Sequence, residues 1–275
     1  MDKKSSFPSR LASLRKWRGL SQLQLAAAAD CSQRHISFLE LGRTQPSREM
    51  LRRLSLALGL SFRQSNDLLL AAGFAPIWSD TPFDAETLAP IRQALDFILE
   101  QQEPYPAVVV DRRWNLLQAN KGAVAMVEFF VGPLTPGAAI NLADALVAPN
   151  LLRRYLRNWQ EVVAYFVRSV EADAAADATE ETATLRDRLL SYPGVQESLA
   201  TPSAETVAAP ILPMRFAKGQ VSLELFTTLT ILGMPQDATL QEMRIESFFP
   251  MNEETRQVFR RWTTSGAATV HKHRS

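Results

Sequence analysis

The stretch LSQLQLAAAADCSQRHISFLELGR at residues 20–43 decides the fold of the first part of this 275-residue chain. Ser21 suits the N-cap of a helix, because its hydroxyl can accept a hydrogen bond from a free backbone N–H of the first turn. Ser32 suits a second N-cap, and after it Ile36 and Leu39 fall three residues apart, as on the buried face of a helix. The stretch therefore predicts two short capped helices joined by a tight turn.

The turn between these helices is Ala29-Asp30-Cys31. Glycine is usual in such a turn because φ is positive there, and Asp tolerates this conformation better than most residues. Helical spacing continues on both sides of the motif, where Leu11, Leu14 and Trp17 precede a stop at Gly19, Pro46-Ser47 begins a fourth helix and Ser61-Phe62 a fifth. Two capped helices at this spacing within a small helical bundle are typical of a helix-turn-helix DNA-binding domain.

The outward side of the second helix carries the residues expected to read DNA. A glutamine near the start of such a helix can pair with adenine and an arginine with guanine, each worth about 1–3 kcal/mol of discrimination. Phe38 can touch a thymine methyl group, while Gln22 and Arg43 are better placed for phosphates, which carry no sequence information. The predicted DNA-contacting residues are Gln22, Ser32, Gln33, Arg34, His35, Ser37, Phe38 and Arg43.

Residues 20–26 and 36–43 resemble the XRE (Cro/C1-type) helix-turn-helix regulators, and the resemblance covers residues 10 to about 75. It departs from the family pattern mainly at Asp30 and Cys31. Membership would imply binding to a double-stranded DNA operator as a homodimer.

The distribution of charge also distinguishes the first 75 residues from the rest of the chain. Residues 1–75 hold 12 Lys or Arg and 5 Asp or Glu, whereas residues 76–275 hold 18 and 24. A basic segment attracts the phosphate backbone and makes affinity fall with salt, and an acidic segment does not. We therefore expect the N-terminal part alone to contact DNA.

The remaining 200 residues predict a second domain. A segment rich in Pro and aromatic residues at 71–82 predicts a linker whose Phe74 and Trp78 dock on a domain, and residues 87–101 predict a connecting helix. Two β-type runs in 105–120 close on Asn120 as a helix cap. We expect a DNA-binding domain at 1–73, a linker and connecting helix at 74–103 and a second domain at 104–275.

Helical patterns dominate residues 120–199, where the apolar positions between Leu152 and Val170 form one continuous stripe that suits either a core-facing helix or a pocket wall. Residues 171–184 are expected to be a solvated segment without a site. Alternating patterns then predict strands at 211–216, 221–231 and around 243–246, before a terminal helix at 253–262. The fold class is therefore multidomain, with an all-α helix-turn-helix domain followed by an α+β domain with an antiparallel sheet.

This β-β-α-β-β-β order is that of a PAS-type sensor, and three stretches carry a closer resemblance. AAGFAP at 71–76, EPYPAVVVDRRWNL at 103–116, and RIESFFP at 244–250 with Leu240 resemble the MmyB-like regulators. The resemblance implies a PAS-like C-terminal domain that binds a small lipophilic effector such as a long-chain fatty acid.

A fatty-acid site needs an apolar slot and a cation or donor for the carboxylate. Arg215 and Arg244 are the candidates for the head group, although a charged residue within a strand also suits the solvent face or an ion pair. Arg112 and Arg113 are interpreted as turn residues only. The candidate walls, each of which also suits a plain core position, are Val108, Val110, Leu116, Met126, Phe129, Leu223, Leu225 and Leu229.

Other classes of function find little support. Of three histidines, His35 lies in the second helix of the motif and His271 and His273 near the end, and Cys31 is the one cysteine, so we expect no enzyme and no metal site. A PAS-type sensor that carries haem or flavin is a further hypothesis, which is disfavoured because no His or Cys in the core of the large domain could bind iron. No signal peptide or long apolar run is present, which predicts a cytoplasmic protein without membrane contact.

The first hypothesis is a transcription regulator whose operator binding responds to a lipophilic ligand. The alternative makes the second domain a protein-interaction or dimerisation module without a small ligand.

Overall fold

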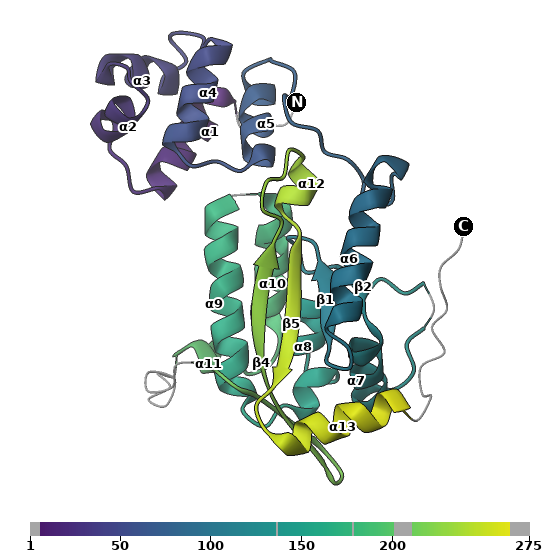
Figure 1. The fold of residues 1–275 in the computed structure, drawn as a ribbon. Helices are drawn as coiled ribbons and strands as arrows, with labels where there is room; N and C mark the ends of the chain where they lie inside the picture. Colours follow the sequence, from purple (N-terminus) through teal and green to yellow (C-terminus); the bar gives the residue numbers. More distant parts are fainter. Residues whose placement is uncertain (1–5, 136, 178, 201–210, 265–275) are drawn as a thin grey trace. The chain divides into compact units, whose positions relative to one another are not determined.

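The computed structural model describes residues 6–135, 137–177, 179–200 and 211–264. They form two compact units (Figure 1). Of the described residues, the first unit comprises 6–82, 175–177 and 233–241, and the second comprises the others. The domain boundaries expected at residues 73 and 103 remain predictions.

The first unit is a bundle of short helices whose starts are fixed by serine caps. Ser21, Ser32, Ser47 and Ser61 each accept a hydrogen bond from the backbone N–H three residues later. The caps predicted at Ser21 and Ser32 are therefore confirmed, and the helices expected to start at Ser47 and Ser61 start there with caps of the same kind. The helices are α1 (Phe7–Trp17), α2 (Gln22–Ala28), α3 (Gln33–Glu40), α4 (Arg48–Ala57) and α5 (Phe62–Ala71).

The turn between α2 and α3 has the predicted conformation. Asp30 has φ 50°, in the left-handed region that few residues other than glycine adopt. The turn lets α2 and α3 bury Leu25, Ile36 and Leu39 in one core with Leu11 of α1. The helix-turn-helix is therefore built as its sequence predicts.

The linker aromatics dock on this first unit, as expected. Trp78 stacks on Phe62 with ring centroids 3.8 Å apart, and Phe74 packs against the helical core. Asn66 of α5 holds the linker backbone, because its side chain accepts hydrogen bonds from the N–H groups of Ile77 and Trp78. The linker is fixed to the bundle as far as Trp78.

The second unit is built on an antiparallel sheet in the order β2-β1-β5-β4-β3. This confirms the α+β class with an antiparallel sheet, and β5 occupies the centre. Glu246 of β5 lies opposite Val108 of β1 and Leu229 of β4. The strands are β1 (Ala107–Val110), β2 (Leu116–Ala119), β3 (Met214–Lys218), β4 (Val221–Ile231) and β5 (Arg244–Pro250).

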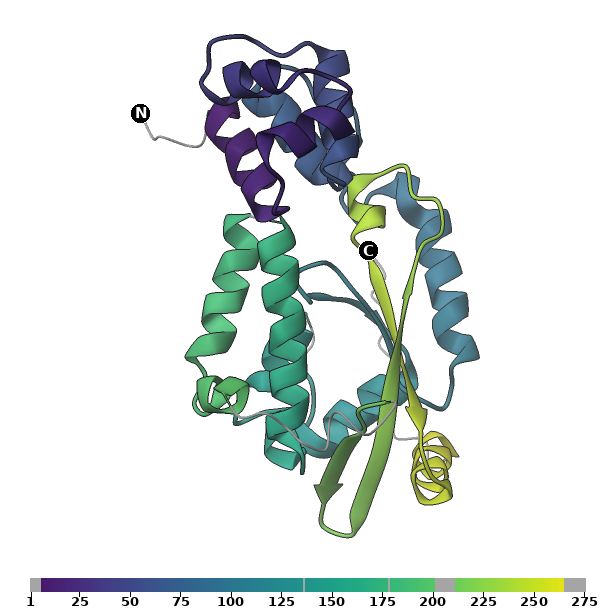
Figure 2. The ribbon, with the colours of Figure 1, turned by 90° about the vertical axis from the view of Figure 1, so that its left-hand side faces the viewer.

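Helices cover both faces of the sheet. Figure 2 shows α9 (Trp159–Asp177) and α10 (Glu180–Ser191) on one side of β4 and β5, and α6 (Ala89–Gln101) on the other. Because side chains alternate along a strand, Arg244, Glu246 and Phe248 share the face opposite to that of Ile245. The other helical elements of the second unit are η1 (Glu86–Leu88), α7 (Lys121–Val131), α8 (Leu142–Val147), η2 (Leu152–Tyr155), α11 (Val195–Ala200) and α13 (Glu253–Thr264), while α12 (Ala238–Gln241) belongs to the first unit.

Asn120 caps α7, as predicted, and does more than cap it. Its Oδ1 accepts hydrogen bonds from the N–H groups of Ala123 and Ala107, each at 2.9 Å. Its Nδ2 donates to the carbonyls of Tyr105 and Leu99 at 2.8 and 3.2 Å. One buried side chain therefore joins α7, β1 and the end of α6.

Three expectations for the middle and end of the chain were wrong. The apolar stripe from 152 to 170 is not one helix, because the chain leaves η2 at Tyr155, bridges Leu156 to Phe216, and begins α9 only at Trp159. The segment 171–184 is not merely solvated, since α9 runs on to Asp177 and Thr182 is buried. The strand expected at 211–216 begins later, at Met214.

Candidate functional site

The outward face of α3 presents the predicted DNA-reading residues. Gln33 and Arg34, at its start, are exposed, whereas Ile36 and Leu39 are fully buried. Ser32 is exposed next to them, and its hydroxyl accepts from the N–H of His35 at 3.1 Å. The polar start of the helix therefore projects from the bundle.

Two arginines lie near Phe38, the phenylalanine on this face of α3. The Arg34 guanidinium lies 5.1 Å from the ring centroid of Phe38, and that of Arg43 lies 5.8 Å from it. These distances allow cation–π contact. Phe38 and Ser37 are half-buried and Arg43 is exposed, so the face combines positive charge with one apolar surface.

A largely buried network of charged and polar side chains joins the C-terminal end of α3 to α1 and α2. Arg15 of α1 forms two hydrogen bonds to Glu40, Nε to Oε1 at 2.6 Å and Nη2 to Oε2 at 2.9 Å. Gln22 of α2 donates its Nε2 to the same carboxylate at 2.8 Å. The side chains of Arg15 and Glu40 are 11% and 7% exposed, so the network joins three helices inside the bundle.

The electrostatics of this network favour the charged forms. Burial acts to raise the pKa of Glu40, but the hydrogen bonds from Arg15 and Gln22 and the Arg15 charge lower it overall. Hydrogen bonding to Glu40 raises the pKa of Arg15 in turn. Gln22, predicted to contact phosphate, has its amide nitrogen directed to Glu40 and thereby connects the start of α2 to the end of α3.

The second unit contains a cavity of about 620 Å³ over one face of its sheet. Such a volume is ordinary for a small-molecule site. Tyr165 and Leu229 are more than half exposed and line it, so the cavity opens to the surface. Its walls come from strands β1, β3, β4 and β5 and from helices α7, α8, η2 and α9.

Five of the ten side chains predicted for the ligand line this cavity: Val108, Met126, Arg215, Leu229 and Arg244. The other five lie elsewhere. Val110, Leu223 and Leu225 are fully buried in the surrounding core, and Leu116 and Phe129 pack against that core. Phe129 instead lies next to Trp262, with ring centroids 4.9 Å apart.

Trp114 is a wall residue that the sequence reasoning missed. It is buried with φ 64° in the β1–β2 turn and meets Phe166 of α9 edge-on at 4.6 Å. The carboxylate of Asp111 holds this turn by accepting hydrogen bonds from the N–H groups of Arg113 and Asn115. A bulky residue at positive φ is costly, and such strain is commonly kept at functional sites.

Glu246 is the second missed residue, and it faces the cavity from the central strand. Burial raises its pKa to about 7, against the opposing effects of a hydrogen bond to Thr227 and the charge of Arg244. The signal was available, because the alternation in 244–250 places Glu246 on the same face as Arg244 and Phe248. Further lining residues that were missed include Glu161, Tyr165, Phe166, Ser169 and Thr227.

Both predicted arginines form ion pairs. Arg244 lies 2.7 Å from Asp173 of α9 and its guanidinium lies 5.6 Å from the ring centroid of Trp114. Arg215 is half-exposed and pairs with Glu224 of β4 at 2.9 Å. Asp173 belongs to the segment 171–184 that was expected to be solvated, and its side chain pairs with Arg244 without lining the cavity.

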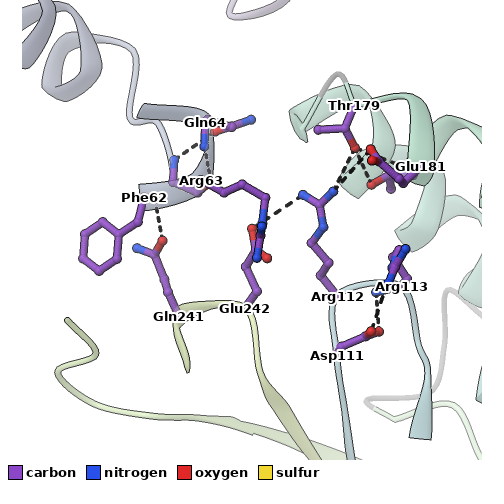
Figure 3. Close-up of polar contacts among 12 residues, drawn as sticks. Phe62, Arg63, Gln64, Asp111, Arg112, Arg113, Thr179, Glu181, Gln241 and Glu242 are labelled. Atoms are coloured by element: carbon purple, nitrogen blue, oxygen red, sulfur yellow. Dashed lines mark hydrogen bonds and ion pairs between the residues drawn. The ribbon is translucent and has the colours of Figure 1, made fainter. Parts of the chain in front are cut away.

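Arg112 is also more than a turn residue. Its side chain is 15% exposed and lies 3.5 Å from Glu242, and it donates to the hydroxyl of Thr179 at 3.0 Å (Figure 3). Glu242 immediately precedes Met243 and β5. The β1–β2 turn that carries Trp114 is therefore tied to the start of the central strand.

The connection between β4 and β5 belongs to the first unit. Gln241 accepts a hydrogen bond from the N–H of Phe62, the first residue of α5, at 2.7 Å (Figure 3). Asp237 accepts from the N–H and the hydroxyl of Thr81 at 3.1 and 2.7 Å, and Ala238 donates its N–H to Ser79 at 2.8 Å. The strands that line the cavity thus continue into a segment bonded to the helical bundle and its linker.

The described residues were also compared with the requirements of a metal site and of a membrane-spanning helix. Within the described residues, no group of three or more His, Cys, Asp or Glu is arranged to hold a metal ion. No described helix is long and apolar enough to span a membrane.

Comparison with known proteins agrees with the two units. Residues 91–261 match the MmyB-like transcription regulator ligand-binding domain, and residues 11–64 match a helix-turn-helix family. No curated protein matches the chain. Among solved structures, the chain is similar at 11% identity to an RNA-binding Light-Oxygen-Voltage receptor, over 94% of this chain and 62% of that one. The TM-score of 0.26 carries no argument about fold or function.

Proposed function

We propose, on the premise that this chain belongs to the MmyB-like transcription regulators, that it binds a DNA operator through α3 and that a small lipophilic molecule in the cavity changes this binding. A helix-turn-helix module together with a ligand-binding domain makes the chain a transcription regulator. The operator contacts, the nature of the ligand and the coupling between them form the proposal.

The DNA half of the proposal rests on the face of α3. Gln33 and Arg34 are exposed at its start, where the side chains of a recognition helix reach base edges. The Arg15–Glu40 pair fixes the helix from behind, so these side chains are presented on a rigid element. A homodimer is part of the proposal, because one such helix reads only one half-site of a two-fold operator.

The ligand half rests on the cavity. Its lining is largely apolar with a few polar groups, which is usual for a small-molecule site. A cavity of about 620 Å³ supports this function over a protein-interaction domain filled by its own side chains. A long-chain fatty acid, implied by the family resemblance, would bury its hydrocarbon chain there.

The observation that carries the coupling is that contacts within each unit meet at the peptide bond between Gln241 and Glu242. Trp114 lines the cavity, and Arg112 of the same turn pairs with Glu242. Glu242 is bonded covalently to Gln241, which accepts from the N–H of Phe62 at the start of α5. If the β1–β2 turn has a second conformation for which the ligand has a different affinity, ligand binding would change operator affinity through this connection.

DNA binding is tested by selecting operators from random duplexes with the full-length protein and repeating the selection with Arg34→Ala. We expect the variant to lose about 1–3 kcal/mol of binding free energy for the selected operator and to discriminate less between bases at one base pair. Arg52→Ala is the matched control, since Arg52 is an exposed arginine of α4 paired with Glu49. Unchanged discrimination by Arg34→Ala would remove α3 from the reading role.

The ligand is tested by native mass spectrometry of freshly purified protein, followed by extraction and identification of any bound lipid. We expect a co-purifying lipophilic molecule and a change in operator affinity when it is removed. A protein that carries no such molecule and binds none of the added lipids would overturn the ligand half and leave the DNA half standing.

Coupling is tested with Gln241→Ala, which removes the acceptor of the Phe62 N–H. We expect ligand affinity and ligand-free operator affinity to stay within about twofold, while the effect of ligand on operator affinity shrinks. Gln236→Ala is the control in the same connection, because its side chain bonds only to the neighbouring Pro235 carbonyl among the described residues. An undiminished ligand effect in Gln241→Ala would reject this route.

A further inference from the structure

The two arginines that line the cavity are held in different ways. Arg215 is 52% exposed, and its Nε donates to Oε1 of Glu224, the residue opposite it on β4, at 2.9 Å. Arg244 is 21% exposed, and its Nη2 lies 2.7 Å from Oδ2 of Asp173 on α9. Arg215 therefore has both water and an aligned acceptor, whereas Arg244 lies deeper and is paired, among the described residues, with a single acid.

The contact between Arg244 and Asp173 is close, but its geometry is poor. Asp173 Oδ2 is buried and forms no hydrogen bond within the described part of the chain, because the N–H groups of Arg244 are not aligned with it. By contrast, Arg15 forms two aligned hydrogen bonds to Glu40 in the first unit. A buried acceptor that lacks a hydrogen bond is destabilising, so an acceptor that aligns better with Arg244 can take its place.

Asp173 lies at one end of the part of α9 that lines the cavity. Phe166 and Ser169 line the cavity three residues apart, and Asp173 follows four residues later on the same side of the helix. The Arg244 guanidinium lies 5.6 Å from the ring centroid of Trp114, another lining residue. The cationic group that contacts Asp173 is therefore within reach of a ligand in the cavity.

Asp173 is the acid that compensates the charge of Arg244. Glu246 lines the cavity together with Arg244, but burial raises its pKa to about 7 against the effect of the Arg244 charge. Glu161 lies about 18 Å before Asp173 along the axis of α9. A ligand carboxylate at Arg244 would replace one carboxylate by another if Asp173, whose side chain is already 34% exposed, turned towards water.

From this arrangement we propose that Asp173 occupies the carboxylate position at Arg244 in the ligand-free protein, and that the carboxylate of a fatty acid binds Arg244 by displacing it. Asp173 is thus a positioning residue that sets the affinity of the cavity for acids without changing its affinity for uncharged lipids. The inference rests on the proposed function, because it names the group that regulates binding of the fatty-acid ligand in the same cavity.

The displacement has a cost that the ligand must overcome. An ion pair between partly exposed side chains is worth up to about 1 kcal/mol, which corresponds to about fivefold in affinity. A neutral side chain at position 173 removes this competition, so an acid should bind about fivefold tighter. An ester with the same hydrocarbon chain does not compete with Asp173 for Arg244 and should bind equally well to both proteins.

The experiment measures the binding of dodecanoic acid and of methyl dodecanoate to ligand-free full-length protein, below their aggregation concentrations and at a pH where the acid is ionised. Asp173→Asn keeps the shape of the side chain and removes its charge. We expect this variant to bind the acid about fivefold tighter than wild type does, with the ester unchanged. Asp173→Glu restores a competing carboxylate and should return the acid affinity towards that of wild type.

Three further variants test the geometry. Glu171→Gln removes the same charge from α9, but two residues earlier and so on the opposite side of the helix, and should change neither affinity. Glu224→Gln removes the partner of Arg215 and should leave the acid affinity unchanged. In an Arg244→Gln background, Asp173→Asn should no longer strengthen acid binding, because the group for which the two carboxylates compete is absent.

The outcomes separate this inference from the function on which it rests. If Asp173→Asn binds the acid no tighter than wild type does, or strengthens acid and ester equally, the displacement is overturned and the ligand-binding function stands. If Glu224→Gln strengthens acid binding instead, the carboxylate lies at Arg215 and the inference is again overturned. If neither probe binds wild type or Asp173→Asn, the ligand-binding function itself fails.

Discussion

One glutamate in each unit has a shifted pKa, Glu40 in the first and Glu246 in the second, and the two shifts have opposite directions. Glu40 receives two hydrogen bonds from Arg15 and one from Gln22, and its pKa is lowered. Glu246 faces the cavity, where it forms no ion pair among the described residues, and burial raises its pKa to about 7. The same residue type thus stabilises the fold where it is paired and marks a site where it is not.

The largest expected effect comes from breaking the paired glutamate. Glu40→Ala leaves Arg15 buried and uncompensated, which should destabilise the first unit by about 3–5 kcal/mol. Hydrogen exchange resolved to α3 measures the loss. Glu49→Ala, which removes an exposed ion pair of similar length with Arg52, should have no measurable effect. Equal effects of the two substitutions would contradict the structural role of Glu40.

The same pair predicts an acid dependence. A carboxylate with a lowered pKa in the folded state contributes stability above its ordinary value of 4.5, and this contribution is lost as the pH falls through the folded pKa. Glu40→Gln should therefore flatten the acid limb of the first unit's stability curve. An acid limb identical to that of wild type would contradict the assignment.

Apolar side chains are also packed more tightly in the core of the first unit than in the cavity wall of the second. Leu39 is fully buried in the first core, so Leu39→Ala should cost about 2–5 kcal/mol. Leu229 lines the cavity and is 54% exposed, so Leu229→Ala should cost at most about 1 kcal/mol. Thermal unfolding of the ligand-free protein measures both. A large loss for Leu229→Ala would show that the cavity wall is a packed core.

The unpaired glutamate predicts an alkaline dependence of opposite sign. Because the folded-state pKa is raised, the contribution of protonated Glu246 is complete below about pH 4.5 and is lost as the pH rises through about 7. Between about pH 5 and pH 8, wild type should lose about 2–3 kcal/mol more stability than Glu246→Gln. Ligand-free protein unfolded at several pH values tests this, and parallel curves for the two proteins would refute it.

The sequence predicted the first unit more completely than the second. Serine caps, the three-residue spacing and Asp30 in the turn are local signals, and every one of them is confirmed. The α3 face follows from the same spacing, because the buried Ile36 and Leu39 determine which residues point outward. The Glu40 network escaped prediction, since Arg15 lies 25 residues earlier and only the packed bundle brings them together.

In the second unit, strands and sheet class were predictable but the cavity was not. Alternation located β4 and β5, yet Val110 and Leu223 carry the same apolar signal as Val108 and lie in solid core. Asn120 shows the same limit: its cap was predicted, whereas its bonds to α6 and β1 depend on the tertiary arrangement. A sequence pattern records which face is buried, but not whether the space beyond it is filled.

The smallest expected effect comes from substitutions of Ser32, which separate the stability of α3 from its contribution to operator binding. Ser32→Ala removes the cap bond to His35 and should cost about 1 kcal/mol of stability. Ser32→Asp keeps an acceptor at the same place and suits the positive end of the helix, so stability should be retained. Its negative charge would nevertheless oppose nearby phosphates, and operator affinity should fall, most strongly at low salt. Because the exposed start of α3 is the part assigned to DNA, a Ser32→Asp protein that binds its operator normally would move the interface away from this helix end.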